Sequence, residues 1–183
     1  MIYMDNAATT AIRKEVAEAM LPYLFCDYGN PSCVYRLSEK AKNVVEESRS
    51  IIADIINADR NEIFFTSGGT EGDNWAVKAE SLKRKHGHII VSSIEHHAVT
   101  ESALWLKNYG IDLTFAPVDE QGIIKLDQLE KMIRNDTFLI SVMLANNEIG
   151  TIQPIENVCE IAHEYGAKVH SDAVAAFGHI DVD

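Results

Sequence analysis

The feature that most constrains the fold is an alternation of short apolar runs with amphipathic helical patterns beyond residue 57. The apolar runs have the length and composition of buried strands. They lie at 62–66, 88–92, 111–116, 138–143 and 168–172. The helical patterns lie at 70–85, 97–108, 126–133 and 155–165. Strands that alternate with helices predict a mostly parallel sheet with helices on both faces, which is a three-layer α/β/α architecture.

The segment before residue 57 has a purely helical pattern. Apolar residues recur at helical spacing over 38–56, which predicts a long amphipathic helix with Ser38 as its N-cap. A shorter helix is expected at 12–24. In the later part of the chain, Gly87, Gly110 and Gly166 follow helical patterns and are expected to stop them. No linker-like or low-complexity stretch marks an internal domain boundary, so we expect a single domain.

Composition excludes several classes of function. The 28 acidic and 16 basic residues give a formal charge of −12, which repels a phosphate backbone and disfavours nucleic acid as a partner. Cys26, Cys33 and Cys159 show neither the pairing nor the spacing of a disulfide framework or a zinc site, which favours a reducing cytoplasm. No apolar run approaches the roughly 20 residues that cross a bilayer, and no secretory signal is visible, so we expect no membrane association.

Polar residues that follow the predicted strands are the candidates for a ligand site, because ligands gather at the carboxyl ends of strands in open α/β sheets. The first group is the glycine-rich stretch 66–72, where Thr70 opens a helix. Free N–H groups and the positive end of a helix dipole at that point favour a phosphate. The alternative is that Ser67 or Thr70 merely caps the helix.

The second group is 92–99, which contains Glu95, His96 and His97. Adjacent histidines point to different faces, so they are poorly placed to bind one metal ion together, and the rest of a zinc ligand set is missing. We therefore predict no metal site. A histidine stacked on a planar ligand and a histidine that simply starts a helix both remain open.

Two further groups follow later strands. In 145–151, Asn146 and Asn147 have side chains that both donate and accept hydrogen bonds, although plain turn chemistry is the favoured explanation for this group taken alone. Asp172 ends the last predicted strand among apolar neighbours, where a carboxylate needs a partner. A protonated ring nitrogen is one such partner, and a helix N-cap role is the alternative. Together the four groups fit one ligand with a phosphate, a flat ring and a basic nitrogen, which describes pyridoxal 5'-phosphate.

Six blocks of the sequence resemble the cysteine desulfurases of the NifS and IscS type, which are pyridoxal-phosphate enzymes of aminotransferase class V. The blocks are 5–10 (DNAATT), 29–32 (GNPS), 65–71 (FTSGGTE), 95–99 (EHHAV), 145–151 (ANNEIGT) and 170–174 (HSDAV). Their order is that of the family. The resemblance covers the whole chain but only about the N-terminal half of a typical member.

The resemblance implies an incomplete large domain of the fold type I of pyridoxal-phosphate-dependent transferases. Residues 1–183 would be one domain, with an N-terminal helical segment over about 1–57 and a cofactor-binding α/β part over about 58–183. It also implies that the chain is truncated before the Schiff-base lysine, the persulfide cysteine and the C-terminal small domain. The activity implied is removal of sulfur from L-cysteine to give alanine and a persulfide for iron–sulfur cluster or thiolation pathways. This chain alone is expected to be inactive and to bind the cofactor weakly or not at all.

The resemblance assigns a role to each matching residue. Gly69 and Thr70 would hold the cofactor phosphate, and His96 would stack on the pyridine ring and assist proton transfer as the catalytic residue. Asn147 would lie beside the ring, and Asp172 would pair with the ring nitrogen. The substrate loop would be Asn6, Ala7 and Ala8.

One departure from the family lies at the expected cofactor site, where Ala175 replaces a common glutamine three residues after Asp172. The implied partners are L-cysteine, a second copy of the chain in a homodimer, and an iron–sulfur scaffold or another sulfur acceptor. The alternative is a non-catalytic interaction domain that self-associates and does not bind pyridoxal phosphate.

Overall fold

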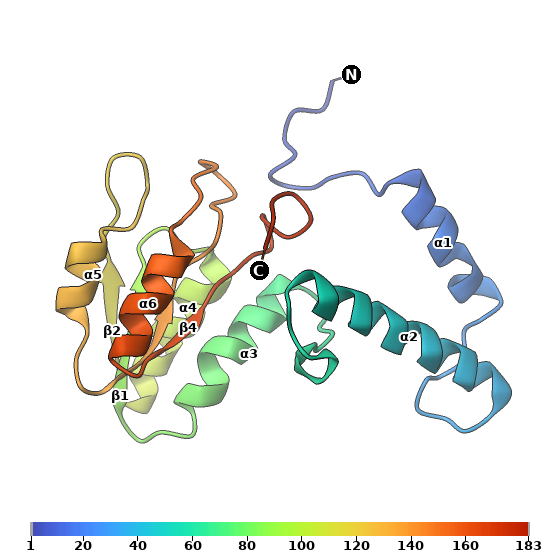
Figure 1. The fold of residues 1–183 in the computed structure, drawn as a ribbon, viewed down its shortest axis with the longest axis horizontal. Helices are drawn as coiled ribbons and strands as arrows, with labels where there is room; N and C mark the ends of the chain where they lie inside the picture. The colour runs from blue at the N-terminus through green and yellow to red at the C-terminus, as the bar shows by residue number, and fades with distance from the viewer. Residues whose placement is uncertain (1, 183) are drawn as a thin grey trace. The chain divides into compact units, whose positions relative to one another are not determined.

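The computed structural model describes residues 2–182, which divide into two compact units. The first unit ends at Phe65, and the second runs from Thr66 to Asp181. Each unit has its own backbone pattern, helical in the first and mixed in the second (Figure 1). None of the helices within residues 2–182 is long and apolar enough to cross a membrane.

The first unit contains α1 (Lys14–Phe25), α2 (Arg36–Ile55) and the 3₁₀ helix η1 (Arg60–Glu62). Both predicted helices are confirmed, but the N-cap prediction is wrong. Tyr35 occupies the N-cap position in an extended conformation, and Ser38 lies inside the first turn of α2. The reason is packing, because Ser38 is fully buried where the chain near Gly29 approaches the start of α2. A Cβ on Gly29 would collide with the carbonyl oxygen of Leu37, so this approach requires glycine.

The strand predicted at 62–66 is absent from the described part of the chain. Asp59 and Glu62 form a capping box instead: the Asp59 side chain accepts from the N–H of Asn61, and Glu62 accepts from the N–H of Asp59, each at 2.8 Å. This local capping fixes η1 at the start of the segment. Ile63 is extended, but the assigned sheet contains no strand from this segment, so its apolar run forms no strand here.

The second unit contains a four-stranded sheet in which every pairing is parallel. Its strands are β1 (Gly87–Ser92), β2 (Ile111–Ala116), β3 (Thr137–Ser141) and β4 (Lys168–His170). Their order across the sheet is β2-β1-β3-β4. The predicted parallel α/β sheet is confirmed, although β3 and β4 end two residues earlier than the apolar runs.

Helices connect these strands and cover both faces of the sheet. They are α3 (Gly69–Ser81), α4 (His97–Leu106) with the 3₁₀ helix η2 (Lys107–Tyr109), α5 (Leu126–Met132) and α6 (Ile155–Glu164). Gly110 and Gly166 follow helical segments with φ values of 80° and 74°, as predicted for helix stops. The prediction for Gly87 is wrong, because α3 ends at Ser81 and Gly87 begins β1.

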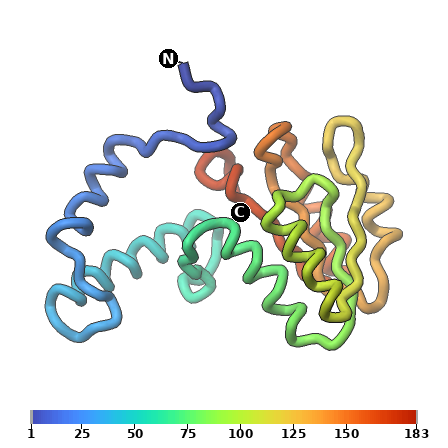
Figure 2. The backbone as a smooth tube through the Cα atoms, turned by 180° about the vertical axis from the view of Figure 1, so that it is seen from behind, coloured from blue at the N-terminus to red at the C-terminus, as the bar shows by residue number. Residues whose placement is uncertain are grey.

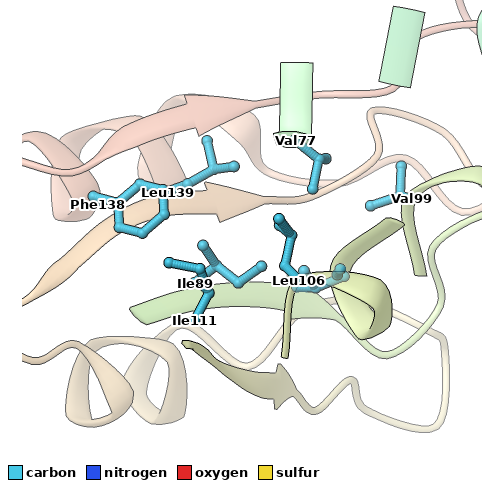
Figure 3. Packing of buried hydrophobic residues seen from close by; sticks show 9 residues of the cluster. Val77, Ile89, Val99, Leu106, Ile111, Phe138 and Leu139 are labelled. Carbon is cyan, nitrogen blue, oxygen red and sulfur yellow. The ribbon is translucent and has the colours of Figure 1, made fainter. Parts of the chain in front are cut away.

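Alternate residues of the strands point to opposite faces and form two apolar clusters. On one face Ile89 and Val91 pack with residues of α3 and α4, such as Val77 and Leu106 (Figure 3). On the other face Ile90 packs with residues of α5 and α6. Figures 1 and 2, which show opposite sides, place α6 and α4 on different faces of the sheet. The three-layer α/β/α architecture is therefore confirmed for the second unit.

Candidate functional site

The carboxyl ends of the parallel strands lie at one edge of the sheet, which we call the carboxyl edge. The order β2-β1-β3-β4 proceeds outward from β1 to β2 on one side and to β3 on the other. The topological switch point therefore lies between β1 and β3, and open α/β sheets bind ligands at such a point. The turns that follow β1 and β3 are where this fold favours a binding site.

Two side-chain hydrogen bonds join these turns. Glu95, in the turn after β1, accepts a hydrogen bond through Oε1 from the backbone N–H of Met143, at 2.5 Å. Asn146, in the turn after β3, donates through Nδ2 to the carbonyl oxygen of Ile94, at 2.9 Å. These contacts bring His96 to the same edge of the sheet as the asparagine turn.

Asp172 joins this edge from the segment after β4. Its main-chain carbonyl accepts from the N–H of Leu144 at 2.8 Å, which ties the segment to the end of β3. Its side chain is 7% exposed, and Oδ1 accepts from the N–H of Val174 at 2.9 Å. The helix N-cap alternative is wrong, because no helix follows Asp172 within residues 2–182 and this bond closes a turn instead. An ionised carboxylate accepts several hydrogen bonds, so the turn still leaves capacity for a cationic ligand.

The start of α3 contacts the same segment. A Cβ on Gly69 would lie 2.6 Å from Cγ2 of Val174, so the glycine lets this helix end approach the residues after Asp172. Gly68 is the N-cap of α3 and offers no side-chain cap. Glu71 accepts from the N–H of Ser67 at 2.6 Å, and this bond lowers the pKa of Glu71. The N-terminus of α3 therefore lies close to the segment after Asp172. Its first turn presents backbone N–H donors and the positive end of the helix dipole.

His96 is the N-cap residue of α4. Its ring Nδ1 accepts from the N–H of Ala98 at 3.1 Å, and the residue is exposed at the carboxyl edge. The helix-start alternative is therefore present, and the exposed side chain remains accessible to a ligand. The rings of His96 and His97 are 6.1 Å apart and tilted by 56°. Within residues 2–182 no group of three or more His, Cys, Asp or Glu side chains is arranged to hold a metal ion.

The two asparagines after β3 differ in their contacts. Asn146 supplies the turn chemistry, because its Oδ1 accepts from the N–H groups of Glu148 and Ile149 at 2.9 Å each. Asn147 is half-buried at the same turn and is not needed to form it. The structure thus separates a turn-forming asparagine from a neighbour whose side chain is available to a ligand.

Sequence reasoning missed three polar residues below this edge. Asp73 on α3 is 5% exposed, and its Oδ1 lies 3.5 Å from Nε2 of His170 on β4. The other ring nitrogen of His170 is 2.9 Å from the hydroxyl of Ser141 on β3. Glu95, which is half-buried, is a fourth polar group here, and the sequence analysis considered it only as a metal ligand. His170 precedes Asp172 by two residues, which is the only signal that the sequence offers for this cluster.

The predicted substrate loop belongs to the first unit. Asn6, Ala7 and Ala8 are exposed and form a turn in which Ala8 N–H donates to the carbonyl of Asp5 at 3.1 Å. Their role stays a prediction. The second unit brings the other predicted residues, namely Gly69, Thr70, His96, Asn147 and Asp172, to the carboxyl edge of one sheet.

Comparison with known proteins gives a consistent result. The aminotransferase class-V family matches residues 2–183. A cysteine desulfurase IscS from Methanosarcina thermophila is 52% identical over the whole chain, which covers 46% of that relative, and one from Dictyoglomus turgidum is 49% identical, with 47% covered. The solved structure of a NifS-like protein superposes on the full chain with a TM-score of 0.95 at 40% identity, and 51% of that protein is covered. SspA in complex with cysteine also gives a TM-score of 0.95 at 40% identity, with 53% covered.

Proposed function

The chain belongs to the aminotransferase class-V family, and we propose that it is the cofactor-holding part of a cysteine desulfurase. The chain spans about half the length of the curated relatives it matches. The activity of the whole protein is therefore part of the proposal: removal of sulfur from L-cysteine, which leaves alanine and a persulfide. A cytoplasmic location, a homodimer and an iron–sulfur or other sulfur-acceptor partner belong to the same proposal.

The residues at the carboxyl edge fit pyridoxal phosphate in their donors and acceptors. Gly69 allows close approach at the start of α3, where N–H groups and the helix dipole favour the phosphate. The carboxylate of Asp172, which is 7% exposed, would pair with the ring nitrogen. His96 would stack on the ring, and Asn147 would lie beside it. Ala175 brings no hydrogen-bonding side chain to this edge, so the set has one donor fewer than the family pattern.

When bound, pyridoxal phosphate supplies an electron sink for a carbanion at the substrate α-carbon. This chain's residues would orient that group and control its charge. Asp172 would keep a proton on the ring nitrogen, because a buried carboxylate favours a cationic neighbour. His96, with Nδ1 engaged by Ala98, would have Nε2 available to hold or move a proton. The observation that carries the proposal is the convergence of Asp172, His96 and the start of α3 on one edge.

The proposal is testable with pyridoxine 5'-phosphate, which retains the ring nitrogen and the phosphate but has no aldehyde to label surface lysines. We expect weak but saturable binding to the chain, measured by equilibrium dialysis. Asp172→Asn should weaken binding about 10- to 100-fold, because a charge-assisted hydrogen bond contributes roughly 1.5–3 kcal/mol. Asp112→Asn makes the same charge change at the amino end of β2 and should leave binding unchanged. Equal affinities for the two variants would contradict the role of Asp172.

A second candidate function is a non-catalytic interaction domain that self-associates. The observation that favours it is the surface of α1, where Leu24 and Phe25 are 64% and 72% exposed and no residue of Lys14–Phe25 is buried. Exposed apolar side chains on one helix are typical of an interaction surface. Absence of any saturable binding of pyridoxine 5'-phosphate, together with dimers in light scattering, would favour this candidate.

A further inference from the structure

Glu95 is a half-buried residue whose carboxyl group is shielded from solvent, and the proposed function does not use it. Its Oε1 accepts from the backbone N–H of Met143 at 2.5 Å, across the switch point between β1 and β3. Its Oε2 is inaccessible to solvent and has no hydrogen-bond partner within residues 2–182. A carboxylate with one unsatisfied buried oxygen is costly, whereas a neutral carboxylic acid is far less so.

The charges around Glu95 also disfavour its ionised form. Asp172, after β4, and Asp73, on α3, are the charged groups that act on it, and both carry negative charge. Asp73 has a cationic partner in His170 when that histidine is protonated, at 3.5 Å. Burial first, and then these two carboxylates, raise the pKa of Glu95 to about 8, against the lowering effect of the Met143 bond. At neutral pH the neutral acid therefore predominates.

We propose that Glu95 is a positioning residue that works as a neutral acid, fixing the turn that carries His96 to the turn that carries Asn147. One oxygen makes the tie to Met143, and the proton on the carboxyl group keeps a second negative charge away from Asp172. A cationic ring nitrogen at this edge would then pair with one defined carboxylate. The part of this inference that concerns the ring nitrogen rests on the proposed function. The hydrogen bond between the two turns is independent of that function.

The neutral form has a consequence for stability. The pKa of Glu95 is raised in the folded chain above its ordinary value of 4.5. Its contribution to folding is therefore fully present below pH 4.5 and is lost as the pH rises towards 8, because over this range the unfolded chain releases the proton while the folded chain still holds it. Stability should decline on the alkaline side because of this one residue.

The experiment compares thermal unfolding of the chain and of Glu95→Gln between pH 5 and pH 9. Glutamine is neutral at every pH and keeps an oxygen for the Met143 N–H. The melting temperature of the unmodified chain should fall relative to that of Glu95→Gln, by about 5 °C between pH 5 and pH 8.5. Glu101→Gln, an exposed change on α4, should give a profile parallel to that of the unmodified chain. Parallel profiles for Glu95→Gln and the unmodified chain would overturn the proposal.

Two further measurements distinguish this proposal from the proposed function: the thermal unfolding of Glu95→Ala and the binding of pyridoxine 5'-phosphate. The alanine variant should melt below Glu95→Gln at all pH values, because it loses the tie, and equal melting temperatures would show that the tie has no role. If pyridoxine 5'-phosphate binds, Glu95→Gln should retain affinity within about twofold at pH 7, and Glu95→Ala should lose about tenfold. If the unmodified chain binds no ligand, the proposed function fails, while the unfolding profiles still decide the role of Glu95.

Discussion

An ionisable side chain lies near each end of β1, and the two side chains differ in how fully their polar atoms are hydrogen-bonded. At the amino end His88 is 1% exposed, and both ring nitrogens have partners, Thr137 at 2.7 Å and Thr114 at 2.8 Å. Beyond the carboxyl end, Glu95 has a partner for one oxygen and, within the described residues, none for the other. The comparison separates a polar group that completes the core from one that is held in place at a candidate site.

The same contrast appears in the pKa values. Burial lowers the pKa of the His88 imidazole and raises the pKa of the Glu95 carboxyl group, so both side chains favour the neutral form. The consequences for stability have opposite signs. The contribution of His88 is lost as the pH falls below 6.5, and that of Glu95 is lost as the pH rises above 4.5.

The largest expected effect is that of His88→Ala. This change leaves a cavity between strands and removes the partners of two threonine hydroxyl groups, so the free energy of unfolding should fall by about 3 kcal/mol in urea denaturation. His86→Ala, an exposed change two residues earlier, is the matched control and should alter the free energy of unfolding by less than about 0.5 kcal/mol. A similar loss of unfolding free energy in both variants would show that burial and hydrogen bonding of His88 have no special role at the amino end of β1.

A smaller effect is expected at the turn after β3. Asn146→Ala removes hydrogen bonds to Ile94, Glu148 and Ile149, and should lower the free energy of unfolding by about 1–2 kcal/mol. Asn147→Ala changes the neighbouring side chain and should cost less than about 0.5 kcal/mol, while weakening binding of pyridoxine 5'-phosphate. Urea denaturation and equilibrium dialysis measure the two quantities. The reverse order of stability losses would show that Asn147 forms the turn.

The smallest expected effect is a loss of folding stability on the acid side of the pH profile. Between pH 6.5 and pH 5.5 the chain should lose up to about 1 kcal/mol through His88, since one proton contributes no more than about 1.4 kcal/mol per pH unit. His88→Gln, which does not titrate, should lack this component. Differential scanning calorimetry of both chains would measure it, and identical profiles would mean that His88 is protonated in the fold with no penalty.

The fold of the second unit was predictable because its signals are local. The run around Ile89 and Val91 is apolar on both faces, which only a strand covered on two sides satisfies. The segment 62–66 has a similar composition, but a strand also needs a neighbour in the sheet, and sequence composition does not reveal that neighbour. Ser38 was misassigned for a related reason, because its burial depends on the approach of Gly29 from outside the helix.

The sequence was sufficient to predict which residues gather at the candidate site. It was not sufficient to predict the hydrogen bonds that hold their turns together. The positions of His96 and Asp172 after predicted strands indicated one edge of the sheet. The expectation for Thr70 rested on the strand at 62–66, which is absent from the assigned sheet. The tie from Glu95 to Met143 joins residues 48 positions apart, and no spacing rule connects them. Asn146 and Asn147 are indistinguishable in the sequence, and only the backbone geometry of the turn assigns their different contacts.

At residue 172 the frame and the chemistry depend on different atoms. The bond from Leu144 N–H to residue 172 uses a main-chain carbonyl, which every amino acid possesses. A chain with the same backbone and another side chain at this position would therefore keep the architecture while losing the carboxylate that the proposed function assigns to a ring nitrogen. Two relatives can therefore share this fold and still differ in the ligand they bind, because of one side chain. Ligand binding should be tested separately in relatives that differ at residue 172.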